Sequence, residues 1–346
     1  MNNVASNKLY WVYFWCSIAV CVMHGAGLTN VVGGGDFWCR FLYYVGIPAM
    51  GWFFFSSAYF LFRNYEEKSW SVIIAKKAKS LMIPYFIWNI IGYIWFSSVY
   101  HKLVLHDNTR FTIKGLFTAF IFLFIPPDKI VSPANGGMWF IARLFSYILI
   151  TPIIARICKK KLGWIAIFII EGIVLGFHVS YYSFIYWLPI YSMGAWCAIN
   201  IRDKYESLLA RNSYDSIMKN RKKFCCGSIL TYILYILILC NGLVSADIGR
   251  FFAPLVIYIC AILWPIKNVA NWWIKHSNFY MYCSHGLFMN IMIPIVLRLN
   301  FLSEKPLVFK YLACVGATLA CVYVSLYLLK KIMPDKWMSL LMGGRA

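Results

Sequence analysis

Residues 11–24 read WVYFWCSIAVCVMH, and this stretch decides the fold class. It carries no charged side chain ahead of its last residue, His24. The largely apolar run around it, 8–28, has the length of about 20 residues that a helix needs to cross the hydrocarbon core of a bilayer. We therefore predict that this segment is a transmembrane helix.

The composition of the whole chain agrees with a membrane protein. Of the 346 residues, 62% are apolar and only 13% are charged, whereas a soluble domain carries about 25% charged residues. So few charges cannot cover a water-facing surface of this size. Lipid must therefore contact much of the exterior.

Nine further apolar runs have lengths that suit membrane spans. We predict an all-α, polytopic integral membrane protein of about ten transmembrane helices, organised as one membrane-embedded domain over 1–346. The apolar stretch 115–126 is too short to cross, and we expect an interfacial or re-entrant helix there. The ten predicted spans lie near 8–28, 38–62, 80–100, 137–157, 162–178, 183–200, 225–243, 251–266, 278–299 and 308–332.

The basic residues predict an orientation. Lys and Arg number 33 against 12 Asp and Glu, a net charge of +21. We interpret this excess as the basic cytoplasmic loops of a membrane protein and expect no nucleic-acid partner. The loops 63–79, 156–161 and 201–224 are rich in Lys and Arg, while 29–37 and 179–182 contain none; the long loop 101–136 is an exception. We predict that both termini are cytoplasmic, in a multi-pass protein of the plasma or inner membrane.

The twelve cysteines lie mostly inside apolar runs and form no C-x-x-C pair. Their spacing is not that of a metal site or a disulfide framework. We interpret them as small apolar packing residues, and we expect no metal.

Four ionisable residues inside the predicted spans are candidates for function, because a charge at the bilayer centre costs at least about 2.5–3.5 kcal/mol. His24 would lie about 24 Å along a helix that begins near Lys8; it suits a general base, or it bonds a neighbouring carbonyl or headgroup. Arg143 could stabilise an oxyanion or extend to the headgroups. Glu171 is expected to form an ion pair or to be protonated, and His285 to act in the site or bond within the core.

A cluster of lysines precedes the third predicted span. Lys76, Lys77 and Lys79 stand just before Ser80-Leu81-Met82-Ile83-Pro84. Three ammonium groups at the inner end of a helix would suit a phosphorylated donor. Positive-inside anchoring is the alternative explanation.

Several motifs occur in the order and spacing of a known family. They are Val22-Met23-His24, the Phe53-Phe54-Phe55-Ser56-Ser57-Ala58-Tyr59 stretch, the basic run that leads to Ile83-Pro84-Tyr85, Met138-Trp139-Phe140-Ile141, and Phe279 through His285. Together they resemble acyltransferase family three, the integral-membrane O-acyltransferases of surface polysaccharides. The resemblance covers nearly the whole chain.

The resemblance implies an acyltransferase that transfers groups other than amino-acyl groups. The donor would be a cytoplasmic acyl-CoA, with acetyl-CoA as the expected one and no separate cofactor. The acceptor would be a cell-surface glycan or its lipid-linked precursor. His24 and Arg143 would be catalytic. The residues expected to contact substrate are Lys76, Lys77, Lys79, Tyr13, Tyr59, Trp139, Glu171 and His285, where Tyr13 occupies a position at which many members have Arg.

Two other functions fit the same sequence. A transporter or flippase of polysaccharide intermediates would also have ten spans with few buried charges, although it should contain an inverted repeat, and none is visible. A catalytically inactive member of the family is the second alternative, because Tyr13 and Ala58 depart from the family's motifs.

Overall fold

The computed structural model describes residues 3–66, 69–95, 135–160, 162–211, 221–265 and 269–344. Within these ranges the chain is helical and contains no strand. This confirms the all-α prediction. The interfacial helix predicted at 115–126 lies outside the described residues.

The chain divides into two compact units. Unit 1 comprises Met1–Met23, Arg40–Ser69 and Thr151–Lys275, and unit 2 comprises His24–Cys39, Trp70–Ile150 and His276–Ala346. Three long helices, α1 (Asn3–His24), α3 (Phe37–Phe62) and α15 (Trp272–Leu297), carry the chain from one unit to the other. The single-domain interpretation stays a prediction.

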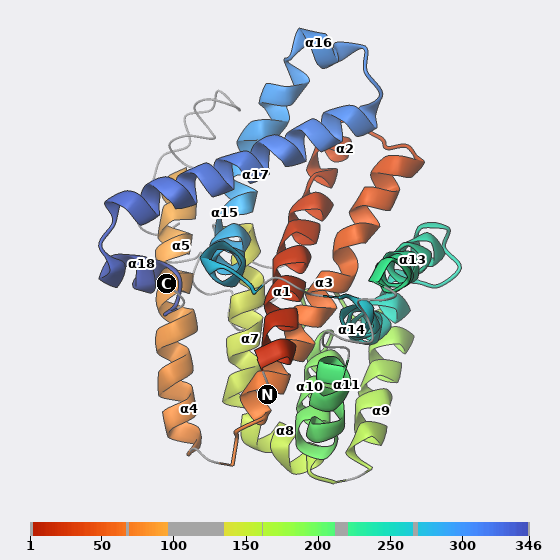
Figure 1. The fold of residues 1–346 in the computed structure, drawn as a ribbon, viewed down its shortest axis with the longest axis vertical. Coiled ribbons are helices and arrows are strands. Elements are labelled where there is room, and N and C mark those ends of the chain that lie inside the picture. Colours follow the sequence, from red (N-terminus) through yellow and green to blue (C-terminus); the bar gives the residue numbers. More distant parts are fainter. Residues whose placement is uncertain are drawn as a thin grey trace. The chain divides into compact units, whose positions relative to one another are not determined.

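Unit 1 is built on most of α1 and α3 together with the middle of the chain. In it α10 packs on α8 and α9, and α13 packs on α14. At Gly194 of α10 the backbone of Phe55 lies so close that a Cβ atom would overlap it. The other helices of this unit are α8 (Thr151–Cys158), α9 (Gly163–Gly176), α10 (Leu188–Asn200), α11 (Arg202–Arg211), α13 (Arg221–Cys240) and α14 (Ala246–Leu263) (Figure 1).

Unit 2 contains most of α15 and the elements on which the predicted catalytic residues lie. The α4 and η1 elements pack on α7, α5 packs on α18, and α2 packs on α17. The segment η1 is a π-helix rather than an α-helix. Besides α15, the unit contains α2 (Ala26–Val32), α4 (Trp70–Lys77), η1 (Ala78–Met82), α5 (Ile83–Ile94), η4 (Gly136–Met138), α7 (Trp139–Leu149), α16 (Asn300–Ser303), α17 (Leu307–Ile332) and α18 (Asp335–Leu341).

Six helical segments among the described residues are long and apolar enough to cross a membrane, or seven if the broken pair Gly136–Leu149 and Thr151–Cys158 is one span. The six are Asn3–Val32, Phe37–Phe62, Arg221–Cys240, Ala246–Leu263, Trp272–Leu297 and Leu307–Ile332. The predicted spans 162–178 and 183–200 correspond to the shorter helices α9 and α10. The protein is therefore polytopic, while the count of ten spans and the cytoplasmic termini remain predictions.

The predicted boundaries are wrong in places where capping groups decide them. We predicted a span from 251, but α14 begins at Ala246, because the Ser245 hydroxyl accepts a hydrogen bond from the amide of Ile248 and caps the helix. This earlier start places Arg250 inside a helix rather than in a loop. The first helix begins at Asn3, so His24 lies about 32 Å along it rather than 24 Å.

Candidate active site

The two histidines predicted from separate spans meet in unit 2. His24 is the last residue of α1, and His285 lies in the middle of α15. Their ring centroids are 4.8 Å apart, with the rings tilted by 48°. His24 is exposed whereas His285 is only 2% exposed. The pair therefore offers one accessible imidazole supported by one buried imidazole.

The tautomer of His285 follows from its hydrogen bond. Its Nδ1 lies 2.9 Å from the carbonyl oxygen of Met281. A carbonyl oxygen can only accept, so Nδ1 carries the proton and donates. In the neutral ring Nε2 is then the nitrogen with a free electron pair. The bond also fixes the ring plane of His285 against its own helix.

A glycine places His24. Gly25 follows His24 at the junction of α1 and α2, and a Cβ atom there would lie 2.5 Å from Cε1 of Tyr311 and 2.8 Å from Cγ2 of Val315 on α17. Only a residue without a side chain permits this approach. The packing against α17 therefore sets the position from which His24 faces His285.

The turn ahead of α7 lies beside His285. The hydroxyl of Tyr282 donates to the carbonyl of Gly137, and a Cβ atom at Gly137 would lie 3.9 Å from Cε1 of His285. Asn135 donates from Nδ2 to the carbonyl of Cys283, at 2.7 Å, and its own amide donates to Asn89 at 3.3 Å. Asn135 is 2% exposed. The turn 135–137 is thus bonded to two adjacent residues of α15, Tyr282 and Cys283.

Arg143 and Trp139 lie on α7, the helix that this turn begins. Both side chains are buried, with Arg143 4% exposed. They are four residues apart and so share one face of the helix. One residue after Trp139, Phe140 packs edge-to-face on Tyr282 with ring centroids 5.7 Å apart. Contacts of this kind connect α7 to the histidine-bearing helix α15.

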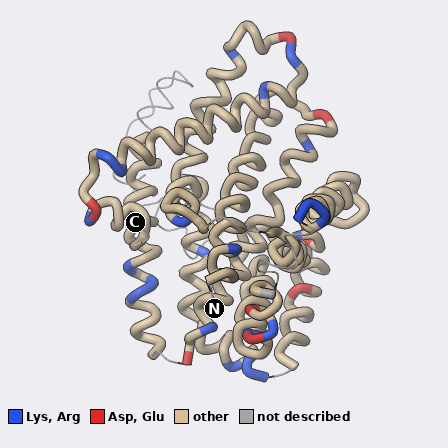
Figure 2. Tube along the Cα trace, viewed as in Figure 1, with Lys and Arg blue, Asp and Glu red and all other residues tan. Residues whose placement is uncertain are grey.

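The three lysines lie on α4 and η1, which pack against α7. Lys76 and Lys79 are exposed, and Lys77 is half-buried. Figure 2 shows the basic residues of this segment as blue sections of the tube. The π-helical turn that follows Lys77 is a rare geometry that occurs frequently at functional sites. Counted together with the residues described above, seven of the ten predicted site residues belong to unit 2.

Glu171, in unit 1, has a partner that the sequence did not indicate. Both of its carboxylate oxygens lie 3.2 Å from Nη2 of Arg250. The two side chains are 5% and 1% exposed. The guanidinium also stacks 3.8 Å above the ring of Tyr186, whose hydroxyl bonds Asp247. The ion pair expected for Glu171 is present, while a role in substrate binding stays a prediction.

Tyr59, also in unit 1, belongs to a charged cluster. Its hydroxyl donates to Glu206 at 3.0 Å, and Arg63 Nε lies 2.8 Å from the same carboxylate oxygen. Arg202 donates to the carbonyl of Arg63 at 3.1 Å. The cluster adjoins a cavity of about 830 Å³ whose charged lining includes Arg63, Glu66, Lys159, Arg202, Asp203 and Lys204.

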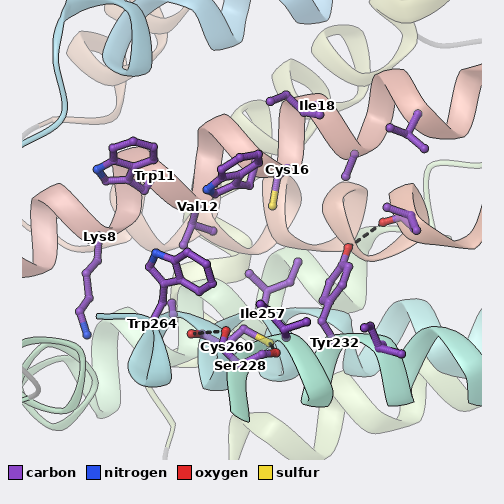
Figure 3. A pocket seen from close by; sticks show the side chains of 17 residues that line it. Lys8, Trp11, Val12, Cys16, Ile18, Ser228, Tyr232, Ile257, Cys260 and Trp264 are labelled. Atoms are coloured by element: carbon purple, nitrogen blue, oxygen red, sulfur yellow. Dashed lines mark hydrogen bonds between the residues drawn. The ribbon is translucent and has the colours of Figure 1, made fainter. Parts of the chain in front are cut away.

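Tyr13 stacks on Phe53 at 5.8 Å within unit 1. Nearby residues of α1 line an apolar groove of about 400 Å³ with α13 and α14 (Figure 3). The polar groups of its walls are bonded within the protein: Ser228 donates to the carbonyl of Cys260, and Tyr232 donates to that of Val45. At one end Lys8 donates to the carbonyl of Ile262 at 3.1 Å, near the end of α14. The groove is thus mainly apolar, and Lys8 is the charged side chain among its lining residues.

Two residues that contribute to these contacts were not predicted from the sequence. Arg250 stood at a predicted loop end, and Asn135 stood at the end of a long loop, so neither looked like a polar residue inside a span. A signal for Asn135 was present in Asn135-Gly136-Gly137 immediately before the Met138-Trp139 motif. Asn and Gly together are typical of turns that begin a helix.

Comparison with known proteins gives one match. A family model described as an acyltransferase domain matches residues 10–326, which is most of the chain. A search of curated proteins and a search of solved structures each found no match.

Proposed function

We propose a donor and an acceptor for this chain, which belongs to acyltransferase family three and is therefore a membrane acyltransferase. It transfers an acyl group, acetyl above all, from a cytoplasmic acyl-CoA to a hydroxyl. That hydroxyl belongs to a cell-surface polysaccharide or to its lipid-linked precursor. The membrane would be the plasma or inner membrane. The observation that carries the proposal is the contact between the exposed His24 and the buried His285.

In the proposed step His24 takes the proton of the acceptor hydroxyl while the oxygen attacks the thioester carbonyl. The resulting oxyanion is stabilised by a positive charge, for which Arg143 is the candidate on α7. The carbon–sulfur bond then breaks, CoA leaves as its thiolate, and His24 returns the proton to that sulfur. The products are an O-acyl ester and CoA, so atoms and charge balance.

Lys76, Lys77 and Lys79 would hold the phosphates of the donor. Their positions on α4 and η1, two elements packed on α7, support this assignment. Lysines bind phosphate as point charges rather than as bidentate forks. We therefore expect a donor site that relies on several weak contacts.

The test compares surface polysaccharide from cells that express the wild-type chain, His24→Ala or His178→Asn, by mass spectrometry. Wild type and His178→Asn should add the acyl mass, because His178 is an exposed residue of unit 1 with a left-handed φ of 46° that Asn also adopts. His24→Ala should lower the transfer rate about 10²- to 10⁴-fold, the usual contribution of a general base.

Full transfer by His24→Ala would disprove the mechanism. No added acyl mass with the wild-type chain, together with unchanged export of the polymer, would point to the inactive-member alternative. If a variant loses export of the polymer and the acylation of the polymer does not change, a transporter would be favoured.

A further inference from the structure

We infer that Asn135 and Tyr282 are positioning residues, which hold the turn 135–137 against His285 and thereby set the geometry of the histidine pair. The inference rests on the proposed function for its kinetic consequences, but its structural part can be tested separately. Both residues act through the turn in this assignment, and neither is a catalytic group.

The first support is that two bonds connect the turn to one stretch of α15. Tyr282 bonds the carbonyl of Gly137, and the side-chain amide of Asn135 bonds the carbonyl of Cys283. These two α15 residues are adjacent and lie two and three positions before His285. The turn therefore cannot shift along α15 without breaking both bonds.

The second support is that Asn135 is buried and is held by neighbouring residues of α5. The side chain is 2% exposed, so a hydrogen bond left unmade there would leave a buried polar group with no water to replace the partner. Its backbone amide is bonded to Asn89, whose own side chain donates to the carbonyl of Tyr85 at 2.8 Å. A Cβ atom at Gly92 would lie 2.8 Å from that of Asn135. Helix α5 thus also contacts Asn135, through Asn89 and Gly92.

The third support is what the turn does at the imidazole. Gly137 lies beside His285, because a Cβ atom added to it would be 3.9 Å from Cε1 of the ring, an ordinary van der Waals contact. The ring of Tyr282 lies 6.5 Å from that of His285. With Nδ1 bonded to Met281, the ring of His285 is bounded by its own helix, by the turn and by His24. A shift of the turn would remove one of these boundaries and change the surroundings of the ring, while the bond to Met281 still holds its plane.

The chain offers a matched control on the same helix. Tyr280 lies two residues before Tyr282, and its hydroxyl bonds Ser325 of α17 at 2.9 Å. Tyr280→Phe and Tyr282→Phe each remove one hydroxyl from α15 and one hydrogen bond to a neighbouring element. Only the second of these bonds reaches the turn beside His285. A general loss of stability should therefore affect both variants, and a loss of positioning only one.

The structural arm records ¹⁵N spectra of the histidine rings in the full-length, detergent-solubilised protein. Tyr282→Phe and Asn135→Ala should each change the ring signals of His285, while Tyr280→Phe should leave them unchanged. The signals are assigned with His285→Gln. Unchanged His285 signals in both Tyr282→Phe and Asn135→Ala would overturn the inference, whatever the enzyme's activity.

The kinetic arm measures incorporation of label from radioactive acetyl-CoA into the polysaccharide fraction of membranes. Tyr282→Phe should lower kcat about tenfold with little change in KM for acetyl-CoA, because misplacing a catalytic group by about 1 Å can cost up to 10²-fold. Asn135→Gln, which keeps the amide donor, should recover part of the activity lost in Asn135→Ala. If Tyr280→Phe loses as much kcat as Tyr282→Phe, the positioning role is wrong. If the wild type incorporates no label, the proposed function fails and the spectra alone decide the positioning role.

Discussion

At the scale of the residue, we predict that stability depends on the buried pair of Glu171 and Arg250. Removing one partner of a buried ion pair costs about 3–5 kcal/mol, because the other charge is left uncompensated, whereas replacing both by apolar residues is often neutral. Arg250→Leu should therefore lower the thermal stability of the detergent-solubilised protein strongly. The double variant Glu171→Leu/Arg250→Met should recover most of it.

The same pair of variants tests whether Glu171 binds substrate. If its role is the ion pair alone, the double variant should regain acyl transfer together with its stability. Recovered stability without recovered transfer would assign Glu171 to the substrate site.

A second residue-scale prediction concerns pH. Glu206 lies on α11, outside the candidate spans. Burial acts to raise the pKa of its carboxyl, but the hydrogen bond from Tyr59 and the charge of Arg63 contribute to a net lowering. A carboxyl with a lowered pKa stabilises the fold above its unfolded pKa, about 4.3, and this stability is lost as the pH falls through the folded value.

The stability difference between wild type and Glu206→Gln should therefore be full at pH 7 and shrink below about pH 4.3. Thermal unfolding across this range measures it. A difference that grows on acidification would contradict the assignment.

The residue scale also marks what the sequence could predict. A histidine or an arginine inside an apolar run is visible because its burial is costly, so His24, Arg143, Glu171 and His285 could be selected without a structure. Two residues around them could not, because Arg250, which pairs with Glu171, and Asn135, which bonds α15 near His285, stood in predicted loops. Pairing depends on tertiary packing, which a single sequence does not record.

At the scale of the element, the junction of α1 and α2 depends on Gly25. Gly25→Ala would push a methyl group to within 2.5 Å of the fully buried Tyr311. Overpacking of this kind costs about 1–3 kcal/mol, and here it should also displace His24. We expect a lower melting temperature and a lower rate of acyl transfer. Gly316→Ala on α17 is the control, since a methyl group there meets no atom within 4 Å.

The segment α4–η1 carries the second element-scale prediction. If Lys76, Lys77 and Lys79 hold the donor phosphates, the triple change to Gln should raise KM for acetyl-CoA at least tenfold, with a smaller change in kcat, because it removes binding common to the ground and transition states. Lys330→Gln and Lys331→Gln, in the last turn of α17, remove the same type of charge elsewhere. An equal effect from these two would indicate anchoring rather than donor binding.

Element boundaries were predictable only where composition changes sharply. The run at 308–332 was placed within one residue of Leu307–Ile332, because Pro306 begins α17 and Lys330 and Lys331 end it. The break after Leu149 has a signal in the sequence, because Pro152 disfavours a continuous helix there, although we predicted one span over 137–157. The π-helical turn at Ala78–Met82 was not predicted.

At the scale of the whole molecule, the charge pattern predicts that both termini are cytoplasmic. Ser207 lies in an exposed part of α11, after a basic loop, and Ser303 is exposed between α15 and α17. Introduced cysteines should react with a membrane-impermeant maleimide in intact cells at 303, and at 207 only after permeabilisation. Cys226→Ser is the background, because Cys226 is the exposed cysteine among the twelve. Labelling at 207 in intact cells, and at 303 only after permeabilisation, would mean that the orientation is the reverse of the predicted one.

The general class of the molecule could be predicted from the sequence, because a low charge content is a property of the whole surface. The division into two units was not. Unit 1 and unit 2 each combine three separate stretches of the chain, and no composition change marks their borders. The membership of His24 and Met23 in different units illustrates this, since both lie in one continuous apolar run.

The π-helical turn at Ala78–Met82 also affects how this segment can change in evolution. It holds one more residue in its turn than an α-helix would, so a single deletion could be absorbed by reversion to a regular helix. Because the turn already contains the extra residue, such a deletion would leave Lys76 and Lys77 near their present orientation relative to α5, whereas a deletion within a regular α-helix would rotate them by about 100°. This segment could then lose one residue without redirecting the lysines.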